Sequence, residues 1–387
     1  MTEGVFLPDR VLRQAAQRFG TPFYVYEEAG IRRRVKAAQE AFASCGGLAL
    51  FFPVRLNPNP AVLNILRESG CGAECVTAEE LRLAARCGFS GASVRYAPLI
   101  PEPEGEALCA ALDAGLVLDD PALRPGFLPR RVWIRIHPCG KLLWSGHAAA
   151  QCEKSKFGMA KCEAFLLANY YLAEGVETGL SVRLAENSCE AELWPAALQA
   201  MLAWAQELCE GSGYRLRCFD LGPGPGISRR SGLPDADLSA VAALLRKAAG
   251  EDEIALSGAP GSWLVGWQGN LVTRAVMVKK RVRPLVILDV DGDAIFTNRA
   301  GEQEVRVLGA RTDNLRTLAL TDVCGCGPTM RDRIAERRVL PPVKAGDLVV
   351  LLALGAHAAA GIPELLWGED GALYRTQEEA PFRVKAW

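Results

Sequence analysis

The chain has 387 residues, with 44 Lys and Arg against 45 Asp and Glu, so its formal net charge is −1. This near balance argues against a protein that binds nucleic acid or an anionic membrane surface, because such proteins carry a basic excess. Hydrophobic residues make up 50% of the chain and charged residues 23%, which is typical of a globular protein and excludes disorder as the main state.

The sequence contains no targeting or membrane signal that we recognise. No apolar run reaches the length of about 18 residues that a membrane-spanning helix needs. The first ten residues include acidic residues and a proline and lack the apolar segment of a signal peptide. The 13 cysteines are therefore expected to be reduced thiols, mostly small core residues, in a cytoplasmic protein.

Short apolar runs alternate with helical patterns through most of the chain. We predict eight strands, at residues 49–54, 73–77, 92–97, 116–118, 132–136, 180–184, 216–221 and 254–257. Helical patterns lie between most of them, at residues 31–43, 61–69, 78–87, 106–114, 161–174, 191–210 and 237–249. Eight such units predict an α/β fold of the (β/α)8 TIM-barrel type, with a doubly wound sheet as the alternative.

The pattern changes after Trp263. Short β-like segments separated by turn residues follow, at residues 271–279, 284–290, 294–297, 304–308, 317–323 and 347–354. We therefore predict a barrel domain over 26–265 and a mostly antiparallel β domain made of 1–25 and 266–387.

A glycine-rich run, Gly222-Pro223-Gly224-Pro225-Gly226, follows the seventh predicted strand. Glycine loops at this end of a barrel often hold phosphate through backbone N–H groups. The two prolines each remove one such donor, so a tight turn between strand and helix is the competing interpretation.

The order of motifs resembles the fold-type III pyridoxal-phosphate (PLP) decarboxylases, which include diaminopimelate and ornithine decarboxylases. The similar segments cover almost the whole chain: 21–26 (Thr-Pro-Phe-Tyr-Val-Tyr), 52–57 (Phe-Pro-Val-Arg-Leu-Asn), 72–81, 155–158 (Ser-Lys-Phe-Gly), 222–227 and 259–262 (Ala-Pro-Gly-Ser). The resemblance implies a barrel followed by a β domain, PLP as cofactor, and head-to-tail dimers.

Several positions depart from the family pattern. The lysine that forms the Schiff base with PLP falls at Arg55, whose guanidinium stays protonated and cannot act as an amine nucleophile. The glutamate that pairs with the pyridine nitrogen falls at Ala259, and the arginine of the same motif falls at Ser262. The two histidines of another motif, one of which stacks on the cofactor ring, fall at Ser181 and Arg183.

Site assignments follow from these matches. The catalytic candidates, none assigned firmly, are Arg55, His137 at the end of the fifth strand, and Cys326, which matches the cysteine of a family loop. A vestigial phosphate or anion pocket is expected from Gly222, Gly224, Gly226, Arg183, Ser262 and His357. Two readings of Arg55 stay open: it clamps an anion together with Arg183, or it pairs with a carboxylate of the barrel. No metal site is predicted.

The missing groups predict a degenerate homologue that acts by binding and needs no covalent cofactor, while non-covalent PLP binding stays open. Its partners would be a small anionic ligand and a second subunit, in a homodimer or in a heterodimer with an active paralogue. The alternatives are an enzyme repurposed for different chemistry at the barrel mouth, and an active decarboxylase whose lysine lies elsewhere.

Overall fold

The computed structural model describes residues 7–137, 154–184, 187–208, 215–228, 232–295, 303–309, 318–356, 361–376 and 383–385. They form two compact units. One comprises Arg32–Ile227 and Asp235–Leu264, and the other comprises Met1–Ile31, Ser228–Pro234 and Val265–Trp387. The exact domain boundaries given above, between residues 25 and 26 and between residues 265 and 266, stay a prediction.

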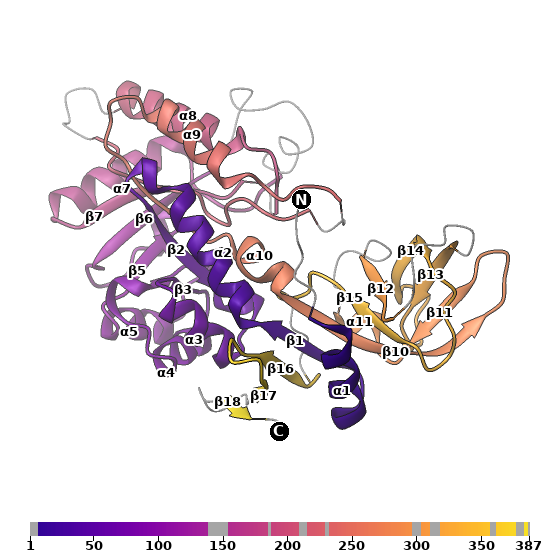
Figure 1. Cartoon of the computed structure of the whole chain (residues 1–387). Helices are drawn as coiled ribbons and strands as arrows, with labels where there is room; N and C mark the ends of the chain where they lie inside the picture. Colours follow the sequence, from indigo (N-terminus) through magenta and orange to yellow (C-terminus); the bar gives the residue numbers. More distant parts are fainter. Residues whose placement is uncertain are drawn as a thin grey trace. The chain divides into compact units, whose positions relative to one another are not determined.

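Eight parallel strands close into a barrel in the first unit, which confirms the predicted fold and excludes the doubly wound alternative (Figure 1). Each strand pairs with the next along the chain, and β2 pairs with β9 to close the ring. The strands are β2 (Leu48–Pro53), β3 (Gly72–Cys75), β4 (Val94–Tyr96), β5 (Gly115–Leu118), β6 (Arg131–Ile136), β7 (Glu177–Val182), β8 (Cys218–Asp220) and β9 (Ala255–Gly258).

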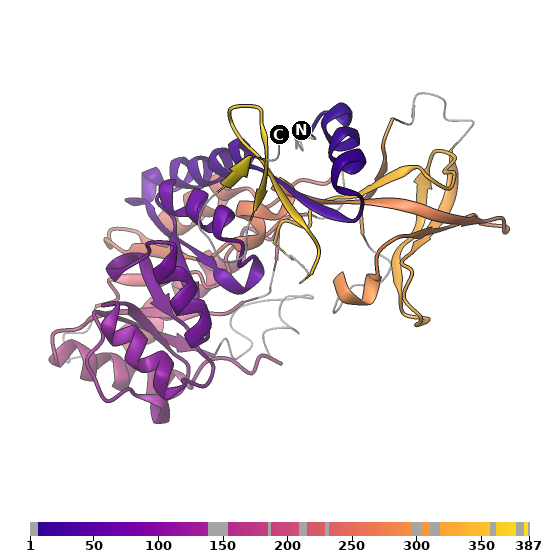
Figure 2. The same ribbon diagram turned by 90° about the horizontal axis from the view of Figure 1, so that it is seen from below.

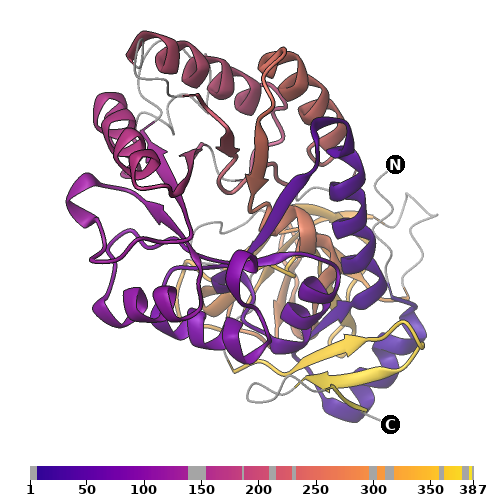
Figure 3. The same cartoon turned by 90° about the vertical axis from the view of Figure 1, so that its left-hand side faces the viewer.

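Helices surround the barrel strands, as Figure 3 shows. Side chains cap the starts of two of them: the Asn59 side chain caps α3, and the Thr77 hydroxyl accepts from the Glu80 N–H at 3.2 Å at the start of α4. The helices are α2 (Glu28–Ala41), α3 (Pro60–Glu68), α4 (Ala78–Arg86), α5 (Pro103–Ala111), α7 (Lys161–Ala173), α8 (Leu193–Leu208), α9 (Leu238–Ala249) and the short α10 (Gly261–Val265).

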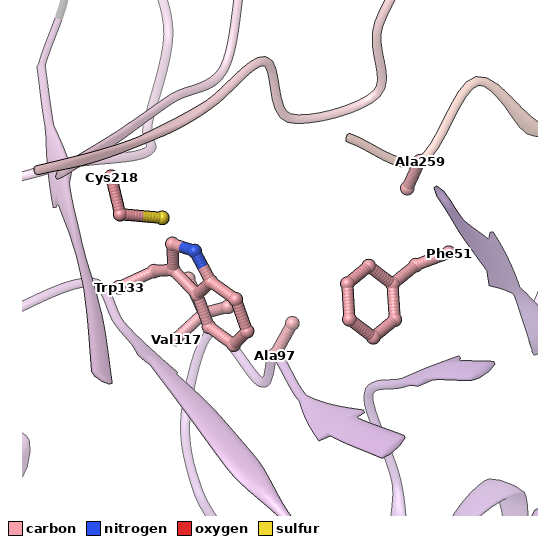
Figure 4. Close-up of a cluster of buried hydrophobic side chains, with 6 residues drawn as sticks. All are labelled: Phe51, Ala97, Val117, Trp133, Cys218 and Ala259. Atoms are coloured by element: carbon pink, nitrogen blue, oxygen red, sulfur yellow. The ribbon is translucent and has the colours of Figure 1, made fainter. Parts of the chain in front are cut away.

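Alternate residues of each barrel strand share one face. Six buried residues in or next to these strands form one apolar cluster, shown in Figure 4: Phe51, Ala97, Val117, Trp133, Cys218 and Ala259. In or directly after five of these strands, the residue two positions away from a cluster member is polar or charged: Arg95, Asp119, Arg135, Asp220 and Ser257. The same alternation therefore places polar groups inside the barrel beside its apolar core.

The second unit is built on a ten-stranded sheet in which most neighbours are antiparallel, as predicted (Figure 2 shows the long β10 in orange). Two pairs, β1–β16 and β11–β13, are parallel. The strands are β1 (Phe23–Glu27), β10 (Gly269–Lys279), β11 (Leu285–Leu288), β12 (Val305–Val307), β13 (Ala319–Cys324), β14 (Arg333–Leu340), β15 (Leu348–Leu351), β16 (Glu364–Trp367), β17 (Leu373–Thr376) and β18 (Arg383–Lys385). Its helices are α1 (Asp9–Phe19) and α11 (Gly292–Ile295).

One predicted strand of this unit is wrong. Residues 294–297 were expected to be extended, but Ala294 and Ile295 lie in α11, and 296–297 lie outside the described residues. The cause is local, because the Asp291 carboxylate accepts a hydrogen bond from the Asp293 N–H at 2.9 Å and turns the chain into a helix. No helix in the described ranges is both long and apolar enough to cross a membrane.

Candidate functional site

A fully buried arginine, Arg95 of β4, lies at the centre of the barrel between two carboxylates. Its Nε and Nη2 donate to Glu74 Oε2 of β3 at 3.0 and 2.6 Å, and its Nη1 donates to Asp220 Oδ1 of β8 at 2.7 Å. Its guanidinium carbon lies 4.4 Å from the ring centre of Phe51, so the cation also contacts an aromatic face. Arg95 therefore joins the polar and apolar parts of the barrel interior.

The carboxylate of Asp220 collects hydrogen bonds from three strands. Ser257 of β9 donates to Oδ1 at 2.9 Å, and Ser181 of β7 donates to Oδ2 at 2.7 Å. With Glu74 and Arg95, these side chains connect five of the eight strands. A buried polar network stabilises the fold only when its donors and acceptors have partners, and both oxygens of Asp220 accept hydrogen bonds here.

The network shifts the pKa values of its members. Burial by itself would raise the pKa of the Glu74 carboxyl, but the guanidiniums of Arg95, Arg55 and Arg135 outweigh it and lower that pKa to about 2. Burial acts to lower the pKa of Arg95, and the Asp220 and Glu74 carboxylates outweigh burial and raise it. Both groups are thus charged throughout the physiological range.

A second buried ion pair joins Arg135 of β6 to Asp119, the residue that follows β5. Burial lowers the pKa of Arg135, Asp119 acts to raise it, and the neighbouring Arg183 acts to lower it further. The other oxygen of Asp119 accepts from the Gly158 N–H at 3.1 Å, which fixes the Ser-Lys-Phe-Gly segment at the barrel mouth.

Arg55 lies in the short turn Val54–Leu56 directly after β2, at the carboxyl end of the barrel where barrel enzymes place their chemistry. Its Nη2 lies 3.6 Å from Glu74 Oε1, and 33% of its side chain is exposed. The second of the two readings of Arg55, pairing with a barrel carboxylate, agrees with this ion pair. The anion clamp remains a prediction.

Arg183 and His137, the other polar candidates of the mouth, both contact the Ser-Lys-Phe-Gly segment. The Arg183 guanidinium carbon lies 4.3 Å from the ring centre of Phe157, and Arg135 lies 5.5 Å from the same ring. His137 Nε2 lies 3.0 Å from the Ser155 carbonyl oxygen. These contacts give His137 a positioning role for the segment; they do not place it on a reacting atom.

The glycine loop follows β8, as predicted, but its N–H groups are engaged within the chain. Gly222 N donates to Asp220 Oδ2 at 3.2 Å, and Gly224 N donates to the Leu221 carbonyl at 3.2 Å. Gly226 N donates to the Ser188 carbonyl at 2.8 Å. Gly222 has φ +61°, and a Cβ there would collide with the Val182 carbonyl oxygen, so this position needs glycine for its turn alone.

Ala259, which was expected at the position of the family's glutamate, is 1% exposed and belongs to the apolar cluster (Figure 4). Ser262 lies half-buried in α10. Cys326 is exposed in the second unit, directly after β13, and burial acts to raise the pKa of its thiol. His357 lies outside the described residues.

Within the described ranges, His, Cys, Asp and Glu form no cluster of three or more that could hold a metal, and the cysteines there are free. Asp332 holds the loop that contains Cys326, because its carboxylate accepts hydrogen bonds from the N–H groups of Gly325 at 3.0 Å and Gly327 at 2.5 Å.

The sequence reasoning missed the charged layer itself. Its missed members are Glu74, Arg95, Asp119, Arg135 and Asp220. A signal was present, because each is a charged residue within or at the end of a short apolar strand, where only an inward-facing partner of opposite charge makes burial tolerable.

Residues 28–266 match the family described as pyridoxal-dependent decarboxylase, pyridoxal binding domain. The diaminopimelate decarboxylase of Deinococcus radiodurans is 28% identical over 393 aligned residues, which cover 96% of this chain and 97% of that protein. The diaminopimelate decarboxylase of Aquifex aeolicus is 24% identical over 370 aligned residues, which cover 92% of this chain and 86% of that protein.

Solved structures show the same fold. The diaminopimelate decarboxylase of M. jannaschii, crystallised with L-lysine, superimposes with a TM-score of 0.80 at 18% identity, covering 96% of this chain and 93% of that one. The fold, the order of its motifs and the match over the barrel agree with one another. The chain belongs to the pyridoxal-dependent decarboxylase family.

Proposed function

We propose that this chain is a homologue of the PLP decarboxylases that acts by binding and does not form the family's covalent link to the cofactor. The observation that carries the proposal is Arg55, the residue at the Schiff-base position, whose guanidinium forms an ion pair with Glu74. An arginine has no accessible neutral form to attack an aldehyde.

The placement of the lysines supports this proposal. In the described part of the barrel unit, Lys36, Lys161 and Lys247 lie on helices, and Lys154 and Lys156 lie exposed in the segment after β6. The Nζ of Lys156 lies 5.4 Å from the ring centre of Phe157, the ring that Arg183 also contacts. Lys141 lies outside the described residues.

Two further features fit PLP poorly. The N–H groups of Gly222, Gly224 and Gly226 are engaged within the chain, so they are not directed at a phosphate. Ala259 presents a methyl group where the family uses a carboxylate to keep the pyridine nitrogen protonated. We therefore derive no reaction step through PLP for this chain.

Arg55 is the group of the mouth best suited to a ligand. Its only ion pair among the described residues is the 3.6 Å contact with Glu74, whose other oxygen is held by Arg95, and its side chain is partly exposed. A small carboxylate or phosphate could take up the remaining guanidinium donors in bidentate geometry. Binding of such an anion, in a homodimer or beside an active paralogue, is the function we propose.

The first experiment is an absorption spectrum of the purified protein with added PLP, followed by borohydride reduction and peptide mass analysis. We expect no aldimine band and no stoichiometric adduct on a single lysine. Arg55→Lys is the matched variant, because it restores an amine at the family position. One adduct on Lys141 or Lys156 in the unaltered protein, lost in the corresponding Lys→Gln variant, would show an active cofactor site and overturn the proposal.

The subunit arrangement is tested separately. We expect sedimentation analysis of the purified chain to give a homodimer with twice the chain mass of 41.7 kDa. If the chain instead pairs with an active paralogue, a dimer should form only after the two proteins are mixed. A monomer under both conditions would contradict the proposed partner.

One observation favours a repurposed enzyme as the second candidate. Arg55 and His137 are both partly exposed at the carboxyl end of the barrel, the end that supplies catalytic groups in this fold. If an activity is found, Arg55→Ala should abolish it and leave the thermal unfolding curve in place. Full activity in Arg55→Ala would remove this candidate.

A further inference from the structure

The hairpin between β10 and β11 ends in a run of basic residues. Residues 279–283 read Lys-Lys-Arg-Val-Arg, so four positive charges fall within five residues of a chain whose net charge is −1. Lys279, Lys280 and Arg281 are exposed and form no ion pair with any residue that the structure describes. In Figure 2 the end of β10, in orange, extends beyond the neighbouring strands of its unit. We call residues 279–283 the basic tip.

Exposed apolar side chains lie at the same end of the sheet as the basic tip. Val282 is fully exposed within it, and Leu320 of β13 pairs with Val339 of β14, with 44% and 61% of these two residues exposed. Lys279 pairs with Leu285, and β13 runs parallel to β11, so one end of each of the four strands meets here. The basic tip has no Trp, Tyr or Phe to anchor it in a lipid interface or to stack on bases. It therefore suits an acidic protein surface that also exposes an aliphatic group.

The loop after β4, in the barrel unit, is such a surface. Residues 100–106 read Ile-Pro-Glu-Pro-Glu-Gly-Glu, with three carboxylates and no cation. Ile100 is 75% exposed, and Glu102 is exposed as well. Glu104 forms a surface ion pair with Arg82 and still has 63% of its side chain exposed. The two prolines fix the backbone angle φ, so this acidic loop loses little conformational freedom when it binds.

Another exposed acidic run, residues 251–253 (Glu-Asp-Glu), matches the basic tip less well. Arg217 and Arg246 line the same cavity as two of its carboxylates, so charges of both signs are already present there. The next residue, Ile254, is 7% exposed and offers no apolar contact. The acidic loop at 100–106 combines negative charge with an exposed aliphatic side chain, and it is the better match.

We propose that the basic tip of one copy binds the acidic loop of a second copy of this chain. Glu102 and Glu104 would face the cations of the tip, and Ile100 would lie against Val282. The tip belongs to the second unit and the loop to the barrel unit, so a two-fold dimer makes this contact twice, in a head-to-tail arrangement. The acidic loop follows β4 and hence lies at the carboxyl end of the barrel, so each subunit would place its tip at the mouth end of the other. The inference rests on the second subunit of the proposed function and identifies the surface that binds it.

Sedimentation equilibrium of the full chain measures the dissociation constant of the dimer. Arg281→Glu in the basic tip and Glu102→Lys in the acidic loop should each raise this constant about tenfold or more, because each places like charges opposite one another. The chain with both substitutions should dimerise more tightly than either single variant, whereas independent effects would add and make it the weakest of the three. Lys36→Glu on α2 is the control, since it makes the same change of charge at an exposed lysine, and it should leave the constant unchanged.

Each contrary result has a separate meaning. Unchanged dimers in both single variants would refute this contact and leave the proposed homodimer in place. A monomeric unaltered protein would refute the contact and the homodimer together, while the test with PLP, which does not depend on subunit association, would keep its result. Additive losses in the doubly substituted chain would show that tip and loop do not face each other. Binding to phosphatidylserine-containing vesicles that Arg281→Glu abolishes, with the dimer unchanged, would assign the basic tip to a lipid surface instead.

Discussion

Arg95 supports the charged layer of the barrel, because both of its carboxylate partners are buried beside its guanidinium. Its side chain is 0% exposed, and those of Glu74 and Asp220 are 8% and 2% exposed. A buried ion pair contributes little net stability compared with an apolar substitute, but removing one member leaves the others uncompensated. The chain is therefore sensitive to single changes in this layer.

Replacing Arg95 with methionine should lower the free energy of unfolding by about 3–5 kcal/mol, because Glu74 and Asp220 would remain buried without their cation. Urea unfolding at pH 7 measures the change. Arg130→Met is the control, since its ion pair with Asp113 lies on the surface with 51% and 63% of the side chains exposed. Equal losses in the two variants would contradict the role given to Arg95.

The pKa of about 2 at Glu74 predicts how stability depends on pH. The folded state keeps this carboxylate ionised down to about pH 2, whereas the unfolded chain takes up the proton near the ordinary value of 4.5. The contribution is therefore complete above about pH 5 and is lost as the pH falls toward 2.

Urea unfolding at pH 3, 4 and 5 tests this dependence. Glu74→Gln should be less stable than the unaltered protein at pH 5, and its stability should fall less steeply on acidification. Glu68→Gln, at an exposed ion pair with Arg32, should follow the unaltered curve. Parallel curves for all three proteins would show that Glu74 titrates normally.

The segment Ser155–Gly158 shows how an element depends on one backbone position. Met159 pairs with Ile136 beside β6, and Gly158 has φ +89° with a Cβ position 2.5 Å from the His137 nitrogen. A side chain at residue 158 would therefore push the segment off β6 and break the contacts of Asp119 and Phe157.

Gly158→Ala should destabilise the protein by about 3 kcal/mol, because the strain of a positive φ is added to a steric collision. Gly175→Ala separates the two causes, since Gly175 has φ +75° but no atom within 4 Å of its Cβ position. This variant should lower the free energy of unfolding by only about 1 kcal/mol. Thermal and urea unfolding of both variants provide the comparison. Similar losses would mean that the collision at residue 158 is relieved without cost.

The elements that could be read from the sequence are those whose pattern is set locally. All eight barrel strands are short apolar runs between helical patterns, and all eight were predicted. β14 was missed because its sequence, Arg-Ile-Ala-Glu-Arg-Arg-Val-Leu, is strongly charged, and its pairing with β13 is a tertiary effect. In the glycine loop, Gly222 and Gly224 donate to Asp220 and Leu221, within the tight turn that was one of the two interpretations of the sequence. The acceptors of Gly226 and Ile227 could not be read, since Ser188 and Asn187 are distant in sequence.

At the scale of the whole molecule, both ends of the chain contribute to one sheet. β1 lies between β10 and β16, and its five residues are all buried. The second unit therefore needs its N-terminal strand as an interior element, although most of its residues follow the barrel in sequence.

Val25→Asp in β1 should unfold the second unit, because an unpaired carboxylate would be buried at a position that is 1% exposed. Val276→Asp in β10, where 49% of the residue is exposed, is the matched control and should fold normally. Soluble yield and circular dichroism report the difference. Normal folding of Val25→Asp would show that β1 is dispensable to the sheet.

The position of β1 also determines the order of events on the ribosome. The barrel strands emerge and can pair with one another while β1, which precedes them in the chain, still lacks both neighbours. Tyr24 pairs with Leu271 on one side and with Glu364 on the other, so its second neighbour arrives only after β11 to β15 have been synthesised. Throughout that interval the apolar Phe-Tyr-Val-Tyr segment is exposed, and we expect it to be the part of the nascent chain that chaperones hold longest.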